Sequence, residues 1–335
     1  MAPVLSRLCS LSNILTDYQR SKIFYPTLRW LKRERKGLQK RKRVGLMPEH
    51  SATEEKIPIQ KLFKPFLFTI CFTGSTFVCA AIWQYENMRK RAFSFIDRQT
   101  EWWKNTPAYK KGSFRKIINE WWNYQTDGQK MAWFIIAINT AILLIWQKPS
   151  LQPLMIKYFC SNPAAKSQCW PMFLSTFSHY SWWHWAANMF VLYSFSSTAV
   201  SMFGKEQFLA LYLSAGVVSS FTSYVYKVLT GRVGLSLGAS GSLLAILAAV
   251  CTQYPETQLT IVFFPFFTFS AGIAIKAVIA LDTAGVLLGW KLFDHAAHLG
   301  GSLFGIFYLL YGQEYLWNRR EVLMKSWHQW REKTK

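Results

Sequence analysis

The sequence is short of acidic residues and has no ordered arrangement of its cysteines. It holds 17 Asp and Glu against 39 Lys and Arg. Its six cysteines form no Cys-x-x-Cys pair and no zinc-type grouping with histidine, so no metal site and no cofactor are predicted. Cys160 and Cys169 fall in one predicted loop, where they either bridge or remain two free thiols.

Several enzyme and transporter signatures are also missing. There is no His-Glu-x-x-His motif and no Gly-x-Gly-Asp motif, which excludes zinc metalloproteases and aspartyl intramembrane proteases. Asp282 has no intramembrane carboxylate partner in the sequence. No internal repeat is visible, which argues against transporters built from inverted repeats. The polar residues of the apolar blocks do not form a charged path of the kind a channel needs.

The first fifty residues are strongly basic. Only Asp17, Glu34 and Glu49 oppose it, and no uninterrupted apolar core of a secretory signal is present. This composition predicts a mitochondrial presequence over residues 1–50, with a disordered basic tail that neutralises acidic lipid as the alternative. Because no nucleic-acid-binding motif accompanies the charge, we expect anionic headgroups and an import machinery as its partners rather than nucleic acid. The basic residues are Arg7, Arg20, Lys22, Arg29, Lys32, Arg33, Arg35, Lys36, Lys40, Arg41, Lys42 and Arg43.

What the sequence has in abundance is apolar blocks. Of its 335 residues, 51% are hydrophobic and 17% aromatic. A helix that spans a bilayer needs roughly 20 largely apolar residues. The predicted fold is therefore an all-α polytopic membrane protein. Seven blocks approach that length, at residues 66–83, 131–147, 183–203, 207–228, 236–253, 258–281 and 290–312.

The blocks are unevenly spaced, which predicts a one-plus-six layout. The first span belongs to a region of residues 51–130 and is followed by about 45 polar residues. A six-helix core covers residues 131–312, and a basic tail covers residues 313–335. The connector holds tryptophans among Lys and Arg, which suits either helices in the headgroup zone or a solvated helical linker.

The first site suggested by the sequence is Ser240, within Gly238-Ala239-Ser240-Gly241 at the start of a span. Alone, this motif indicates close helix packing more often than catalysis. It is also not the nucleophile elbow of soluble hydrolases, because Ser242 stands where that elbow needs glycine.

The second is His298, which lies on the last span. Ala297, Gly301 and Gly305 recur every four residues there and form a small-residue face. The span at 236–253 is also rich in Gly, Ser and Ala, so the two helices are expected to touch. His298 would then reach the Ser240 hydroxyl and could take its proton.

The third is a pair of polar residues. His184 and Asn188 are four residues apart and project from one face of the 183–203 helix. Acyl transfer needs hydrogen-bond donors for an oxyanion, and both side chains can supply them. Taken alone, the two residues also fit a purely structural interpretation, with His184 at a helix end and Asn188 in a helix-packing contact.

Together these residues resemble the rhomboid protease family. The resemblance rests on Gly238-Ala239-Ser240-Gly241, on Ala297-His298 with Gly301 and Gly305, and on His184 with Asn188-Met189. His179 also matches a family histidine. The similarity covers residues 131–312, and the extra first span with a presequence resembles the mitochondrial branch of the family.

The resemblance implies a catalytic dyad of Ser240 and His298. His184, Asn188 and the Ser240 backbone amide would hold the oxyanion, and Gly238, Gly241, Gly301 and Gly305 would let the helices pack. The family pattern needs no third acid, so Asp294 is expected to cap its helix.

The resemblance also places a lateral gate between the 183–203 and 258–281 helices. Pro265 would permit bending there, although a lipid-facing aromatic run is the alternative. One departure is Trp170-Pro171, where other rhomboids often carry Trp-Arg, so lipid contacts of that loop are not transferred. The gate residues would be Phe263, Phe264, Pro265, Phe266 and Phe267.

The implied function is cleavage of single-span inner-membrane proteins in or beside their spans, with consequences for mitochondrial quality control and apoptosis. A catalytically inactive relative that binds transmembrane helices is the alternative. Inner-membrane lipids such as cardiolipin, a homo-oligomer and an inner-membrane protease complex are the other expected associations. With seven spans and a presequence, the N-terminus is expected in the matrix and the C-terminus in the intermembrane space.

Overall fold

The computed structural model describes residues 57–101, 113–261 and 264–334. The chain divides into two compact units at Glu54–Glu55, and the described residues all belong to the second unit. The presequence predicted over residues 1–50 lies outside the described residues.

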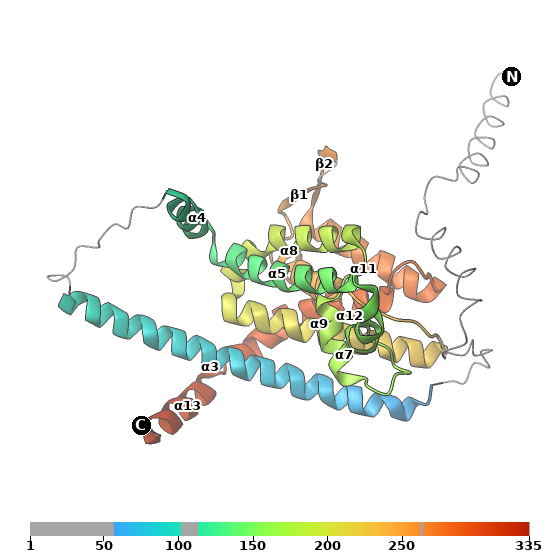
Figure 1. Ribbon diagram of the computed structural model, residues 1–335, viewed down its shortest axis with the longest axis horizontal. Coiled ribbons are helices and arrows are strands. Elements are labelled where there is room, and N and C mark those ends of the chain that lie inside the picture. Colours follow the sequence, from blue (N-terminus) through green and yellow to red (C-terminus); the bar gives the residue numbers. More distant parts are fainter. Residues whose placement is uncertain (1–56, 102–112, 262–263, 335) are drawn as a thin grey trace, which may run out of the picture. The chain divides into compact units, whose positions relative to one another are not determined.

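The described unit is a bundle of long helices, so the prediction of an all-α polytopic membrane fold is confirmed (Figure 1). Four described stretches are long and apolar enough to cross a membrane: Ile59–Ser94, Asp127–Trp146, Lys205–Thr230 and Ala271–Leu288. The long helices are α3 (Phe63–Glu101), α5 (Asp127–Trp146), α8 (Trp182–Phe203), α9 (Lys205–Thr230), α10 (Ser240–Gln253), α11 (Ala271–Leu288) and α12 (His295–Phe307), which continues as a π-helix, η4 (Tyr308–Trp317).

Shorter elements connect the long helices. Between α5 and α8 the chain forms η2 (Pro149–Leu151), α6 (Gln152–Phe159), α7 (Cys169–Leu174) and η3 (Ser175–Phe177). Cys160 and Cys169 are both free thiols in this connection. The remaining helices are η1 (Ile59–Leu62), α4 (Ser113–Tyr124) and α13 (Glu321–Lys333).

Helix α10 packs very closely against α12, because glycines on α12 leave no side chains between the two backbones. A Cβ on Gly301 would lie 2.1 Å from the carbonyl oxygen of Gly241, and one on Gly305 would lie 2.1 Å from that of Ala245. The two backbones of α10 and α12 therefore touch, as in small-residue interfaces of membrane helices. This contact fixes the start of α10 beside the start of α12.

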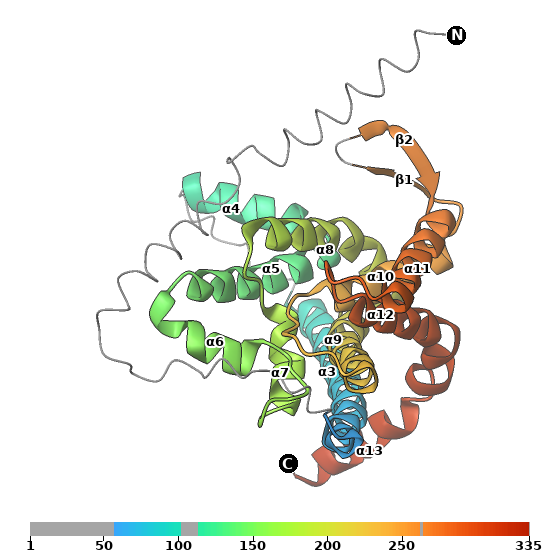
Figure 2. The ribbon, with the colours of Figure 1, turned by 90° about the vertical axis from the view of Figure 1, so that its right-hand side faces the viewer.

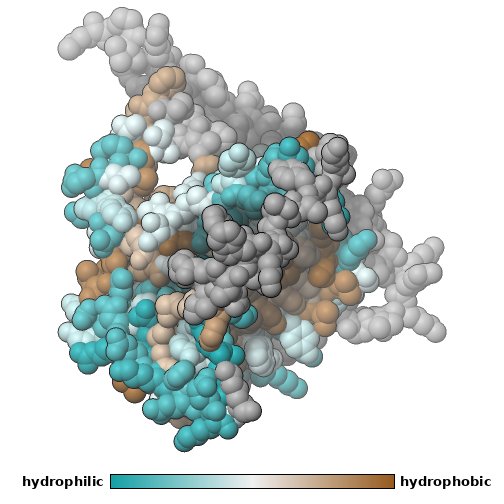
Figure 3. Space-filling view, turned by 90° about the vertical axis from the view of Figure 1, so that its left-hand side faces the viewer, coloured by the Kyte–Doolittle hydropathy of each residue, from teal (hydrophilic) through white to brown (hydrophobic). Residues whose placement is uncertain are grey.

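The additional helix α3 packs along α9, outside the core (Figure 2). Its polar end is held by the C-terminal helix α13: Trp327 Nε1 donates to Glu86 3.0 Å away, and Arg331 pairs with the same carboxylate. Figure 3 looks onto the side where α4 and α13 lie, and hydrophilic residues cover much of the described surface there. The appended helix is thus anchored by the other end of the chain.

The prediction of a span at residues 258–281 is wrong in its first half. Residues Gln258–Ile261 (β1) and Phe264–Ser270 (β2) form an antiparallel hairpin that projects from the bundle, and α11 begins only at Ala271 (Figure 1). Aromatic and β-branched residues favour strands, and the Ser270 side chain accepts from the Ile273 backbone N–H 3.3 Å away, which starts the helix there. Pro265 lies in a strand, so it bends no helix.

Candidate functional site

Ser240 is the first residue of α10, at the end of a loop with a special backbone conformation. Gly238 has φ 130°, which L-residues with a side chain rarely adopt. A Cβ at this glycine would also lie 2.7 Å from the His184 ring. Glycine is therefore required twice, once for the turn into α10 and once for the approach of His184.

His298 faces Ser240 from α12. Its Nε2 atom lies 2.8 Å from Ser240 Oγ, which is hydrogen-bonding distance. The helix that carries the ring is fixed at its start, where Asp294 Oδ1 accepts from the Ala297 backbone N–H at 3.0 Å, as the sequence predicted for an N-cap. The structure thus brings together the two residues expected to form a dyad.

The other carboxylate oxygen of Asp294 forms an ion pair and two hydrogen bonds that connect the start of α12 to α9 and to the loop before Ser240. Asp294 Oδ2 lies 3.4 Å from Lys227 Nζ at the end of α9, and Ser223 and Ser236 donate to it. Ser236 stands in the loop that leads to the nucleophile, and its backbone pairs with Ser161 in the long connection after α5. This network ties the loop before Ser240 to the helix of His298.

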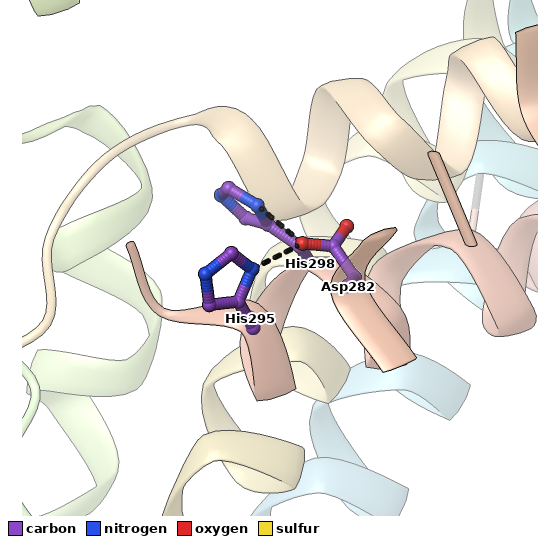
Figure 4. Close-up of side chains that lie close together, drawn as sticks. All are labelled: Asp282, His295 and His298. Carbon is purple, nitrogen blue, oxygen red and sulfur yellow. Dashed lines mark hydrogen bonds and ion pairs between the residues drawn. The ribbon is translucent and has the colours of Figure 1, made fainter. Parts of the chain in front are cut away.

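A carboxylate behind His298 was not expected from the sequence. Asp282 of α11 is 1% exposed, and its Oδ1 lies 2.7 Å from His295 Nδ1 and 3.3 Å from His298 Nδ1 (Figure 4). The ring of His298 therefore has Ser240 on one nitrogen and Asp282 beside the other. The sequence did contain one signal for it. A single Asp in an apolar span is energetically costly, and such a residue is a candidate for a functional role.

His184 and Asn188 lie on α8 next to the nucleophile. One N–H of the Asn188 amide is donated to the His184 carbonyl at 2.7 Å, and the side chain lines the same cavity as Ser240 and His298. The amide has a second N–H for another acceptor. Asn188 thus lines the cavity of Ser240, and the His184 ring lies against Gly238, two residues before the nucleophile.

His179 supports the loop from behind. It is fully buried, its ring lies 4.9 Å from that of His184, and its Nε2 accepts from the Ala239 backbone N–H at 3.4 Å. Burial, helped by the neighbouring His184, lowers the pKa of His179 to about 3. The ring therefore stays neutral and can act as an acceptor beside the nucleophile.

Two apolar cavities adjoin the site. One of about 410 Å³ reaches Ser240, Asp282 and His298, and one of about 730 Å³ lies between α8, α10, α11 and the hairpin. Val191 and Val278 line both, so the two cavities are adjacent. Together these two apolar cavities extend from the hairpin to the nucleophile, and they are called the passage below.

Of the predicted gate residues, the structure describes the side chains of Phe266 and Phe267, and neither lines this passage. Phe266 is 93% exposed on the hairpin, and neither it nor Phe267 lines the larger cavity, whereas Phe269 does. Phe263 and the side chains of Phe264 and Pro265 lie outside the described residues. Phe269 belongs to the same aromatic run of the sequence, so that run contributes one side chain to the lining of the larger cavity.

Comparison with known proteins gives consistent matches. A sequence model of the rhomboid domain matches residues 166–314, which include His184, Asn188, Ser240, Asp282 and His298. The mitochondrial presenilin-associated rhomboid-like proteins of Mus musculus and Homo sapiens are each 56% identical over 292 residues, which is 86% of this chain and 78% and 77% of theirs. The mitochondrial Rhomboid protein 1 of Saccharomyces cerevisiae is 31% identical over 209 residues, 62% of this chain and 60% of that protein.

Proposed function

Because the chain belongs to the rhomboid family and is closely similar to its mitochondrial presenilin-associated members, we propose that it is an intramembrane serine endopeptidase. The observation that carries the proposal is the 2.8 Å contact between His298 Nε2 and Ser240 Oγ inside a helical membrane bundle. A serine hydroxyl is a weak nucleophile unless a base takes its proton, and this contact supplies the base.

The proposed reaction is a two-step acyl transfer. Ser240 Oγ attacks the peptide carbonyl as its proton passes to His298, and His298 then protonates the leaving amine. Water, deprotonated by the same ring, releases the acyl group from Ser240. The negative oxygen of each tetrahedral intermediate would be held by the Ser240 backbone N–H, His184 and the second N–H of Asn188.

Asp282 gives this proposal a third member that the family pattern does not require. Its carboxylate lies beside His298 Nδ1, where it favours the tautomer with a proton on Nδ1 and a free Nε2 for Ser240. It also stabilises the imidazolium that forms when the serine is deprotonated. Because Asp282 is proposed to act through His298 and not on the reacting atoms, it is a positioning residue.

The shape and lining of the cavities support a transmembrane substrate. The larger cavity is apolar, lies between α8 and α11 and adjoins the cavity that reaches Ser240. A single-span membrane protein could enter there with its apolar residues kept out of water. To reach the serine the substrate must expose a backbone carbonyl, so cleavage is proposed in or beside the span where the helix is weak.

The setting proposed for this activity is the mitochondrial inner membrane, since the relatives named above are mitochondrial. By family resemblance, the substrates would serve mitochondrial quality control and apoptosis. Cardiolipin and other anionic lipids fit the basic charge outside the spans. The N-terminus is proposed to face the matrix.

The rival function is a catalytically inactive binder of transmembrane helices. The bonded pair of Ser240 and His298 favours the protease, because a binder has no use for a base on a serine. Both functions need the fold and the passage between α8 and α11, so neither feature separates them.

The deciding experiment is proteolysis of a model single-span substrate in liposomes by purified protein. Wild type should yield two fragments, whereas Ser240→Ala and His298→Ala should yield none. Ser242→Ala is the matched control: Ser242 lies on the same helix but donates to the Tyr212 carbonyl, away from the site. Substrate that copurifies with wild type without being cut would support the binder.

A further inference from the structure

Asp282, His295 and His298 form a buried cluster of potential metal ligands. One ligand atom from each, a carboxylate oxygen and two imidazole nitrogens, lies within 4.8 Å of the other two. Asp282 is 1% and His295 is 4% exposed, so these two are enclosed by protein. The proposed catalytic mechanism uses Asp282 and His298 and leaves His295 without a role.

His295 is held in this place by its surroundings. Gly285 lies on α11 one turn from Asp282, and a Cβ there would lie 2.4 Å from the His295 ring. The rings of Trp290 and Phe293 pack edge-on against the His295 ring, with distances between ring centroids of 5.7 and 6.0 Å. The imidazole is therefore fixed with Nδ1 directed at Asp282, as a preorganised ligand requires (Figure 4).

The donor set is the one that Zn²⁺ takes in sites with an open position. Two histidines and one carboxylate bind Zn²⁺ at about 2.0–2.2 Å, which puts donor atoms about 3.3 Å apart in a tetrahedral site. The present separations from Asp282 Oδ1 are 2.7 and 3.3 Å. All three ligand atoms lie within 4.8 Å of one another, so the largest separation must shorten by up to about 1.5 Å to give tetrahedral spacing. Because His295 is held in place, the movement would come from the His298 side chain, which is 18% exposed.

The cluster also has an approach and an outer hydrogen bond. Asp282 and His298 line the cavity of about 410 Å³, so an ion that enters it meets both residues and a fourth position remains for water. A ligating histidine usually bonds through its other nitrogen to a nearby acceptor. Here His298 Nε2 already faces Ser240 Oγ.

We propose that Asp282, His295 and His298 bind Zn²⁺ and that the bound ion switches off the nucleophile. This inference rests on the proposed protease function for its consequence but not for its binding. Zn²⁺ takes the lone pair of His298 Nδ1, so the proton of the neutral ring must reside on Nε2. The proton lost from each Nδ1 returns to Nε2 through solvent, so no net proton is released. His298 Nε2–H can then donate to Ser240 but cannot accept its proton.

Binding is tested on the Ser240→Ala protein, which keeps all three ligands and cannot cleave. With the full-length protein in detergent and free of chelator, competition against a chromophoric Zn²⁺ chelator should report one tight site. His295→Asn and Asp282→Asn should each weaken it at least 10-fold. His328→Asn is the control, because His328 bonds to Tyr85 on the far α3–α13 contact. Equal affinity in all four proteins would overturn the site.

Inhibition is tested separately on proteins that keep Ser240. Zn²⁺ should inhibit wild type, a chelator should restore the rate, and His295→Asn should raise the inhibitory concentration at least 10-fold. Inhibition that persists unchanged in His295→Asn would overturn the switch. If wild type cuts no substrate, the proposed function fails, while tight Zn²⁺ binding to Ser240→Ala would still establish the site. Gel filtration of each variant, with His295→Gln as a second substitution, excludes unfolding as the cause.

Discussion

Asp282 Oδ1 lies 3.3 Å from His298 Nδ1, across the imidazole from the nitrogen that contacts Ser240. The carboxylate comes from α11 and the histidine from α12, so the alignment depends on how these helices pack. A dyad alone would leave Nδ1 to water or to a backbone carbonyl. The buried carboxylate beside Nδ1 instead favours the tautomer that carries its proton on Nδ1.

Asp282→Asn should therefore lower kcat by about 100–10,000-fold with little change in KM, because the amide can donate to Nδ1 and favour the wrong tautomer. Steady-state cleavage of a single-span substrate measures both constants. Asp282→Glu should recover part of the rate, since it keeps a carboxylate. A change confined to KM would show that Asp282 serves substrate binding and not His298.

Asn188→Ala should lower kcat by roughly 10–1000-fold at nearly constant KM, because an oxyanion donor acts on the transition state. Thr198→Ala is a matched control on the same helix, since Thr198 lines the larger cavity and not the one that holds Ser240. Labelling of Ser240 by a fluorophosphonate should also slow in Asn188→Ala. An unchanged kcat with a raised KM would assign the amide to docking.

Gly301→Ala should destabilise the bundle by about 1–3 kcal/mol or more, because the added methyl would lie 2.1 Å from a backbone carbonyl that cannot move aside. Gly74→Ala on α3 is the control, since a Cβ there meets nothing within 4 Å and alanine favours the helix. Thermal unfolding in detergent measures both. Equal effects of the two substitutions would show that α10 and α12 are not in backbone contact.

The layout of the bundle was predictable because membrane spans and small-residue faces are local patterns. The recurrence at Ala297, Gly301 and Gly305 is visible in the sequence and corresponds to the side of α12 that meets α10. The position of Ser240 and His298 on those two helices follows from the same pattern. Their expected roles stay predictions until activity is measured.

What could not be predicted depends on pairing between distant elements. Asp282 and His298 are neighbours only because α11 packs beside α12, and no spacing in the chain encodes that contact. The strands Gln258–Ile261 and Phe264–Ser270 were predicted as helix because the length of the apolar run was given more weight than its aromatic and β-branched residues. The pairing of Leu259 with Phe269 is a contact between two segments that apolar length alone does not reveal.

The last prediction concerns orientation in the membrane. An odd number of spans places the termini on opposite sides, and a presequence draws the N-terminus into the matrix. The C-terminus would then lie in the intermembrane space and the connection between α5 and α8 in the matrix. The basic residues of α13, among them Arg331 and Lys333, oppose this arrangement. Under the positive-inside tendency, Lys and Arg are favoured on the inner side of the membrane, here the matrix, and not in the intermembrane space.

We give the presequence more weight, since import begins at the N-terminus and long segments cross largely regardless of charge. In mitoplasts, whose outer membrane is open, added protease should remove a tag placed after Lys335. A tag inserted at Ala164–Ala165, in the connection between α6 and α7, should survive until the inner membrane is dissolved. The opposite protection pattern would show that the orientation is reversed and that the connection between α5 and α8 faces the intermembrane space. The contact between Ser240 and His298 would be unaffected.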